Sequence, residues 1–108
     1  KENKTFNQII NLNKCVKDKN FIIYYNYNPE NNNYRFGISV GKKIGHAVIR
    51  NKYKRKIRNI IDNNKKLYAK KLDYIIIVRK NCLNLTFLEM EKSFIQLINK
   101  IKKEDLYD

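Results

Sequence analysis

The stretch from Gly41 to Arg58 has the residue types and spacing to bind a polyanion. It reads GKKIGHAVIRNKYKRKIR, eight of its eighteen residues are Lys or Arg, and no acidic residue lies between Glu30 and Asp62. Arg presents a planar fork of N–H donors that matches phosphate oxygens, while Lys supplies point charge. Asn51 can donate and accept at a base edge, a sugar or a phosphate. This cluster favours contact with nucleic acid.

A helix starting at Ala47 would place these side chains on one side. At about 100° per residue, apolar and basic residues fall on two adjoining arcs. The apolar arc contains Ile49, Tyr53, Ile57, Ile60 and Ile61, and the basic arc contains Arg50, Asn51, Lys54, Arg55 and Arg58. The pattern predicts a helix whose apolar side enters a core and whose basic side stays exposed.

The overall charge also favours a polyanionic partner. The chain has 108 residues, a net charge of +14 and a pI near 9.9, and we expect one domain over residues 1–108. A/T-rich coding alone could enrich Lys, Asn, Ile and Tyr, so Arg is more informative. Of five Arg residues, three (Arg50, Arg55 and Arg58) lie within nine positions on the predicted basic helix. Compositional bias does not place residues on one face.

Residues that could perform catalysis are scattered. Metal-dependent hydrolysis needs converging carboxylates, and general-base catalysis commonly uses His. The acidic residues group only at Glu89 with Glu91 and within residues 104–108, and the sole histidine, His46, adjoins the basic helix, where a capping or surface role is expected. We therefore expect no catalytic residue and no metal site in the polypeptide.

The cysteines and the hydropathy narrow the class of protein. Cys15 and Cys82 lie far apart without a CxxC or Cys/His grouping, so neither a zinc site nor a disulfide framework is predicted. No apolar run approaches the length of a membrane span, and no charged-then-apolar leader is present. We expect a soluble, cytoplasmic protein without a membrane partner.

The remaining chain predicts an α+β fold. The expected elements are a short helix over residues 5–12, strands over 20–27 and 34–40, the basic helix, a polar connection over 63–71, a strand over 74–78 and a final helix. The apolar run at 74–78 predicts a strand at the centre of the sheet, covered on both faces. Strand 34–40 alternates, with Tyr34, Phe36, Ile38 and Val40 on one side and Arg35, Gly37 and Ser39 on the other.

The final helix has the clearest sequence signals. Thr86 and Glu89 have the spacing of a capping box, and Leu85 and Met90 occupy the positions of a hydrophobic staple. The apolar stripe that we assign to the core comprises Phe87, Met90, Phe94, Leu97, Ile98 and Ile101.

Several blocks of the sequence resemble the protein subunit of bacterial ribonuclease P. They are FGISVGKKIG at residues 36–45, AVIRNKYKRKIR at residues 47–58 and DYIIIVRK at residues 73–80, with looser similarity at Phe6 and at residues 21–24. The resemblance implies a two-layer α/β sandwich of order αβββαβα, with a central mixed sheet and a left-handed βαβ crossover, as in a ribosomal protein domain. It also implies a short extra strand near Cys15 and Val16.

The resemblance further implies a role beside a catalytic RNA. Proteins of this family assist a large RNA subunit that removes the 5′ leader of precursor transfer RNA, with Mg²⁺ held mainly by the RNA. An Arg-Asn-Arg signature on the basic helix packs against the catalytic RNA. A cleft between the first helix and the sheet holds the single-stranded leader.

Matching positions imply two sets of contacts. The contacts with the RNA subunit fall on Arg50, Asn51, Lys52, Lys54, Arg55 and Arg58, of which Arg50 and Lys54 lie near the leader junction. The leader-binding cleft comprises Phe6, Ile10, Ile22 and Tyr24, with Lys43 near the junction.

Three positions depart from the family pattern. Lys52 stands where the signature has its second Arg, so a bidentate contact becomes monodentate. His46 stands where Asn, a better N-cap, is usual. Ile10 stands where an aromatic residue is common, which leaves stacking to Phe6 and Tyr24.

Two other interpretations stay open. A structural RNA-binding protein of ribosomal type could use the same basic helix without a leader cleft. A basic amphipathic helix could lie on an anionic membrane, but its apolar arc should be needed by the core.

Overall fold

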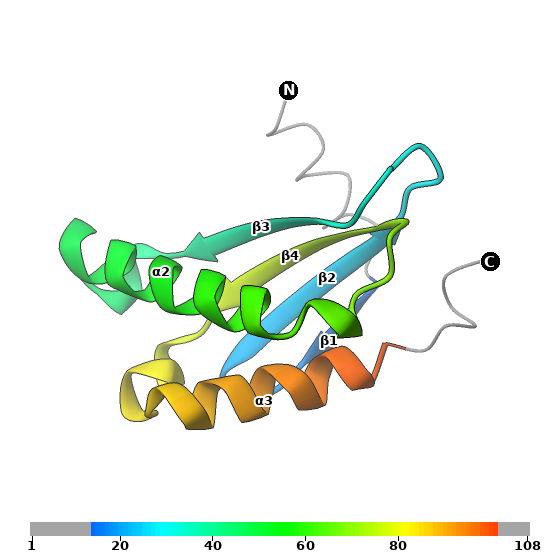
Figure 1. The fold of residues 1–108 in the computed structure, drawn as a ribbon. Helices are drawn as coiled ribbons and strands as arrows, with labels where there is room; N and C mark the ends of the chain where they lie inside the picture. Colours follow the sequence, from blue (N-terminus) through cyan, green and yellow to red (C-terminus); the bar gives the residue numbers. More distant parts are fainter. Residues whose placement is uncertain (1–13, 102–108) are drawn as a thin grey trace.

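In the computed structural model, which describes residues 14–101, a four-stranded sheet packs against two helices (Figure 1). In chain order the elements are β1 (Cys15–Lys17), β2 (Phe21–Tyr27), β3 (Arg35–Val40), the 3₁₀ turn η1 (Lys42–Ile44), α2 (Ala47–Asn63), η2 (Lys65–Leu67), β4 (Leu72–Val78), η3 (Lys80–Asn84) and α3 (Phe87–Asn99). The expected helix over residues 5–12 lies outside the described residues.

The sheet has the order β1-β2-β4-β3. β2 runs antiparallel to β1 and β4, whereas β3 and β4 are parallel and joined through α2. The chain leaves β3, passes along α2 in front of the sheet and returns to β4 with a left-handed sense (Figure 1), opposite to most βαβ units. The α+β class, the central position of β4 and the strand at Cys15 are therefore confirmed.

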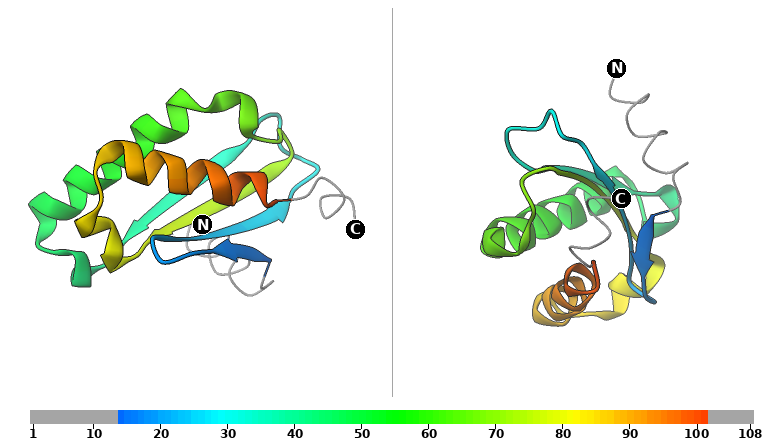
Figure 2. Two further views of the ribbon diagram at one scale, coloured as in Figure 1. Left: turned by 90° about the horizontal axis from the view of Figure 1, so that it is seen from below. Right: turned by 90° about the vertical axis from the view of Figure 1, so that its right-hand side faces the viewer.

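The core lies between the sheet and the helices, both of which cover the same face (Figure 2). Phe21, Ile23 and Tyr25 of β2 point to this face, and every second residue of β4 joins them. This alternation follows from the strand period of two. Neither α2 nor α3 covers the opposite face (Figure 2), here called the open face, on which Asp73 and Ile75 are nevertheless buried. It carries Ile22, Tyr24 and Asn26 of β2, Arg35, Gly37 and Ser39 of β3, and Asp73, Ile75 and Ile77 of β4.

The start of α3 has the predicted capping box. The Glu89 backbone N–H donates to the Thr86 hydroxyl oxygen at 3.2 Å, and the Thr86 backbone N–H donates to the Glu89 carboxylate at 2.8 Å. Met90, Phe94, Leu97 and Ile98 are buried, so the apolar stripe is a core face.

An aromatic cluster joins the two layers near the end of α2. The rings of Phe36 and Tyr74 are stacked with centroids 4.5 Å apart, and Tyr68 packs edge-on against Phe36 at 4.7 Å and Tyr34 at 5.0 Å. The connection expected to be polar therefore contributes a buried aromatic residue to the core.

Candidate functional site

The start of α2 is set by the backbone rather than by a side-chain cap. Gly45 has φ 155° and ψ −170°, a conformation that side-chain-bearing residues rarely adopt, and an added Cβ would lie 3.1 Å from the Ile49 side chain. The N-cap residue His46 makes no side-chain capping hydrogen bond. Gly45 thus directs the chain into α2, whose first free N–H groups and positive dipole end add to the local attraction for anions.

Five residues on the exposed side of α2 line a shallow hollow, here called the α2 hollow. They are Val48, Asn51, Lys54, Arg55 and Arg58. On a helix these positions share one arc, opposite the buried Tyr53, Ile57 and Ile60. Four of the six residues expected to contact the RNA subunit are therefore brought together.

Val48 was not among the expected site residues. Its side chain is 79% exposed, although Val is an apolar residue. The signal that identifies it is an apolar side chain placed on the arc opposite the core stripe. In the hollow it offers an apolar contact between cationic groups.

Two expected positions differ from the simple helical projection. Arg50 is half-buried, and its Nε atom is buried without a hydrogen-bond partner, because its position borders the arc of Ile57. Ile49, expected in the core, is 40% exposed at the edge of the buried arc. Lys52 is exposed but is not among the residues that line the α2 hollow.

The open face brings together the described residues of the expected leader cleft. Ile22 and Tyr24 are half-buried neighbours on β2, opposite Ile77 and Ile75 of β4 in the strand register. Lys43 is exposed in η1, directly after the end of β3. Phe6 and Ile10 lie outside the described residues. The result is an apolar strip with one aromatic ring and a cation beyond its end.

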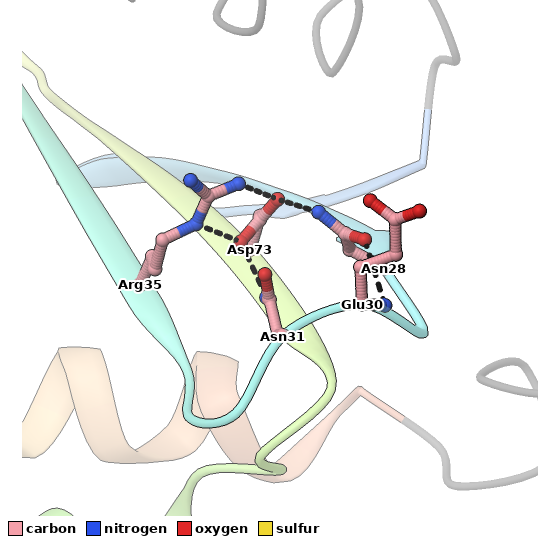
Figure 3. Close-up of polar contacts among 5 residues, drawn as sticks. All are labelled: Asn28, Glu30, Asn31, Arg35 and Asp73. Atoms are coloured by element: carbon pink, nitrogen blue, oxygen red, sulfur yellow. Dashed lines mark hydrogen bonds and ion pairs between the residues drawn. The ribbon is translucent and has the colours of Figure 1, made fainter.

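A polar cluster occupies the other end of the open face. Asp73 accepts two hydrogen bonds from Arg35, one from Asn31 at 2.7 Å and one from Asn28 at 3.3 Å (Figure 3). Burial alone would raise the pKa of Asp73, but these hydrogen bonds and the Arg35 charge outweigh it and hold the pKa below its ordinary value. Asp73 therefore stays ionised with its oxygens occupied.

A second basic hollow lies where β4 ends and the β1–β2 turn begins. It is lined by Lys17, Asp18, Lys19, Arg79 and Asn81. Arg79 Nη1 donates to the Asp18 carbonyl at 2.9 Å, which fixes its side chain at this end of the sheet.

The described residues do not form a protein cage for a divalent cation. Within residues 14–101, no group of three or more His, Cys, Asp or Glu residues could hold a metal ion. Asp73, the buried carboxylate, is committed to Arg35 and two Asn amides. Cys15 and Cys82 are free thiols, and burial raises the pKa of Cys82 to about 12.

No helix in the described part of the chain is long and apolar enough to cross a membrane. The apolar arc of α2 is also occupied, since Tyr53, Ile57 and Ile60 are buried against the sheet. A membrane-surface role for this arc is not supported.

Comparison with known proteins gives one consistent family. The family model described as Ribonuclease P matches residues 1–102. The ribonuclease P protein component of Mycoplasma mycoides subsp. mycoides is 48% identical over 103 residues, covering 94% of both chains. That of Bacillus cereus is 37% identical over 100 residues, covering 93% of this chain and 87% of the relative.

Solved structures agree with these relatives. The Staphylococcus aureus RNase P protein is 34% identical and superposes with a TM-score of 0.85, covering 94% of this chain and 93% of the other. The Thermotoga maritima RNase P protein is 27% identical, also with a TM-score of 0.85, covering 94% and 96%. The fold of the described residues is therefore shared with these proteins.

Proposed function

The chain belongs to the ribonuclease P protein family, and on that premise we propose that it assists a catalytic RNA in removing the 5′ leader of precursor transfer RNA. The α2 hollow carries this proposal. It gathers Lys54, Arg55 and Arg58 with Asn51, and none of the residues that line it is acidic, which suits phosphate contact.

The α2 hollow binds the catalytic RNA. Exposed Arg55 and Arg58 offer N–H pairs to phosphate oxygens, and Val48 packs on sugar or base edges between them. If this side of α2, with Arg50 and Lys52 at its flanks, neutralises about five phosphates, log Kd should change with log salt by a slope of about 3.5 to 4.5.

The open face binds the single-stranded leader. The Tyr24 ring stacks on an unpaired base, Ile22 supports it, and Lys43 attracts phosphates where the leader meets the transfer RNA. The family resemblance also assigns Phe6 and Ile10, which lie outside the described residues, to leader binding. Because stacking accepts any base, this contact gives affinity with little sequence preference.

The chemistry is performed by the RNA subunit, which would also hold most of the Mg²⁺. The protein's contribution is to reduce the repulsion between two polyanions and to fix the leader's path. Its effect should therefore be largest when Mg²⁺ is scarce, since the protein's cations then replace counterions.

Reconstitution with a cognate catalytic RNA tests the proposal. Adding the protein should increase precursor processing strongly at low Mg²⁺ and weakly at high Mg²⁺. Replacing Lys54 and Arg55 with Gln should lower affinity for the RNA and reduce the salt slope by about 1.4 to 1.8. The matched control replaces Lys92 of α3 and Lys100, which directly follows α3, with Gln and so removes the same charge elsewhere. No gain in processing at any Mg²⁺ concentration would refute the proposal.

A second test separates this function from that of a structural RNA-binding protein. Tyr24→Ala should weaken binding of precursor relative to leaderless transfer RNA, while Tyr24→Phe, which keeps the ring, should not. Affinity for the catalytic RNA alone should stay the same in both variants. Equal loss for every RNA, or no loss, would favour the structural role.

A further inference from the structure

We propose that Arg35, held in place by Asp73, reads the base of a leader nucleotide beyond the one that stacks on Tyr24. This inference rests on the leader-binding role proposed for the open face. It assigns a sequence preference to a face whose other contacts are apolar or stacking.

The Arg35–Asp73 pair leaves one edge of the guanidinium free. Arg35 Nε donates to Asp73 Oδ1 at 2.9 Å and Nη2 donates to Oδ2 at 2.8 Å. Guanidinium has five N–H donors, so three remain, including the adjacent pair on Nη1 and Nη2 that points away from Asp73. Asp73 is the only partner of this group among the described residues, and the Arg35 side chain is 59% exposed.

The position of Arg35 is fixed before any ligand binds. It lies opposite Asp73 in the parallel register of β3 and β4. The Asp73 side chain is 5% exposed and is also held by Asn31 and Asn28, as Figure 3 shows. Lys71 Nζ ties the β2–β3 loop to β4 by donating to the Pro29 carbonyl at 3.0 Å and the Asn31 carbonyl at 2.7 Å. A donor pair held this firmly loses little entropy on binding.

The charge of this cluster favours a base over a phosphate. Asp73 compensates the Arg35 charge, and the exposed Glu30 lies in the adjoining loop (Figure 3). By contrast, none of the residues that line the α2 hollow is acidic. A neutral, oriented donor pair suits a ligand with two uncharged acceptors on one edge, which in RNA is the O6 and N7 edge of guanine.

The register places this contact at a separate nucleotide. Arg35 begins β3, whereas Lys43 follows its end, so Arg35 lies at the end of the open face remote from the leader junction. Arg35 lies two strands across the sheet and two residues along it from Tyr24, so the two positions are about 12 Å apart. Asn26, next to Asp73 on β2, adds an amide to the same row. The nucleotide read here is farther from the cleavage site than the one at Tyr24.

The test measures binding of precursors that carry each of the four bases at each leader position. Wild type should prefer guanine by about tenfold at one position upstream of the Tyr24-dependent nucleotide. Arg35→Lys keeps the charge beside Asp73 but lacks the fork, and should abolish this preference. The double variant Arg35→Gln with Asp73→Asn avoids leaving a buried charge unpaired, and should abolish the preference without changing the salt slope.

The outcomes separate the possible roles of Arg35. A base preference that survives in both variants, or its absence in wild type, overturns the inference. Reduced thermal stability with equal affinity loss for all leaders would mean that Arg35 and Asp73 form only a structural ion pair. A smaller salt slope in the double variant would mean that Arg35 contacts a phosphate. Either of these two results also overturns the inference. If Tyr24→Ala still weakens leader binding, only this inference fails. If wild type shows no leader dependence, the proposed leader-binding function fails with it.

Discussion

The Tyr68 hydroxyl donates a hydrogen bond of 2.8 Å to the Ile61 backbone carbonyl in the last turn of α2. Both residues are buried, so the C-terminal end of the basic helix is fastened to the aromatic cluster and through it to β3 and β4. The Ile61 carbonyl lies where the i to i+4 bonds of the helix end, and it also accepts a hydrogen bond from the Asn64 backbone N–H at 3.2 Å. Tyr68 therefore helps to hold the surface that carries the α2 hollow.

Tyr68→Phe should destabilise the protein by about 0.5 to 1.5 kcal/mol, because the ring packing remains and the Ile61 carbonyl keeps its Asn64 donor but loses the Tyr68 hydroxyl. Urea unfolding measures this difference. Tyr34→Phe, which also alters a hydroxyl of the aromatic cluster but at a half-buried residue, is the control and should cost less. Equal stability of the Tyr68 variant and wild type would show that the hydrogen bond contributes nothing net.

His46→Asn should stabilise the protein by about 1 kcal/mol, because Asn is a favourable N-cap and His46 makes no capping hydrogen bond. The corresponding increase in Tm is about 4 °C. His46→Ala is the matched control, and it should leave the Tm nearly unchanged because no cap is lost. A drop in Tm for His46→Ala would show that His46 has a stabilising contact of its own.

The elements that follow from local patterns could be predicted from the sequence. The capping box at Thr86 needs only residues three positions apart, and the alternation from Phe36 to Val40 needs only the strand period. The burial of Tyr68 could not be predicted, because its partners Phe36 and Tyr74 come from two different strands. A helical projection gives the direction of each side chain around the helix axis, but it does not predict how deeply that side chain is buried.

The residues of α2 likewise include some whose placement could be predicted from the sequence and some whose placement could not. Lys54, Arg55 and Arg58 were expected on one exposed arc, and the structure places them there. Arg50 lies at the border with the core, where its depth depends on how α2 packs against β3. The hydrogen bonds of Arg35 to Asp73 depend on a register between parallel strands far apart in sequence, for which the chain has no local signal.

Lys52→Arg should increase affinity for the catalytic RNA. Lys52 is exposed on α2, so an Arg side chain can extend into solvent there without a packing cost. Its guanidinium can donate two parallel hydrogen bonds to one phosphate, whereas the Lys ammonium acts as a point charge. We expect a gain of about 1 kcal/mol, or roughly fivefold in Kd, with an unchanged salt slope because the charge is the same. Filter binding at several salt concentrations measures both quantities. The control Lys100→Arg, directly after α3, should have no effect, and an equal gain there would indicate a nonspecific preference for Arg.

The ion pair of Asp73 should make stability depend on pH in the acidic range. Its pKa in the folded protein is lowered from an ordinary value of 3.8, because the hydrogen bonds and charge of its partners outweigh the effect of burial. The carboxylate's contribution is therefore fully present above the unfolded-state pKa and is lost as the pH falls through the folded-state pKa. Asp73→Asn removes this titration.

Urea unfolding of both proteins at pH 7, 5, 4 and 3 tests the sign of this effect. Wild type should be more stable than the Asn variant at pH 7 and pH 5, and its advantage should shrink at pH 4 and pH 3 as Asp73 is protonated and its bond with Arg35 weakens. Glu30→Gln, which alters an exposed carboxylate in the same loop, is the control and should preserve the pH dependence of wild type. An advantage that stays constant from pH 7 to pH 3, or grows as the pH falls, would show that the folded state does not lower the pKa of Asp73.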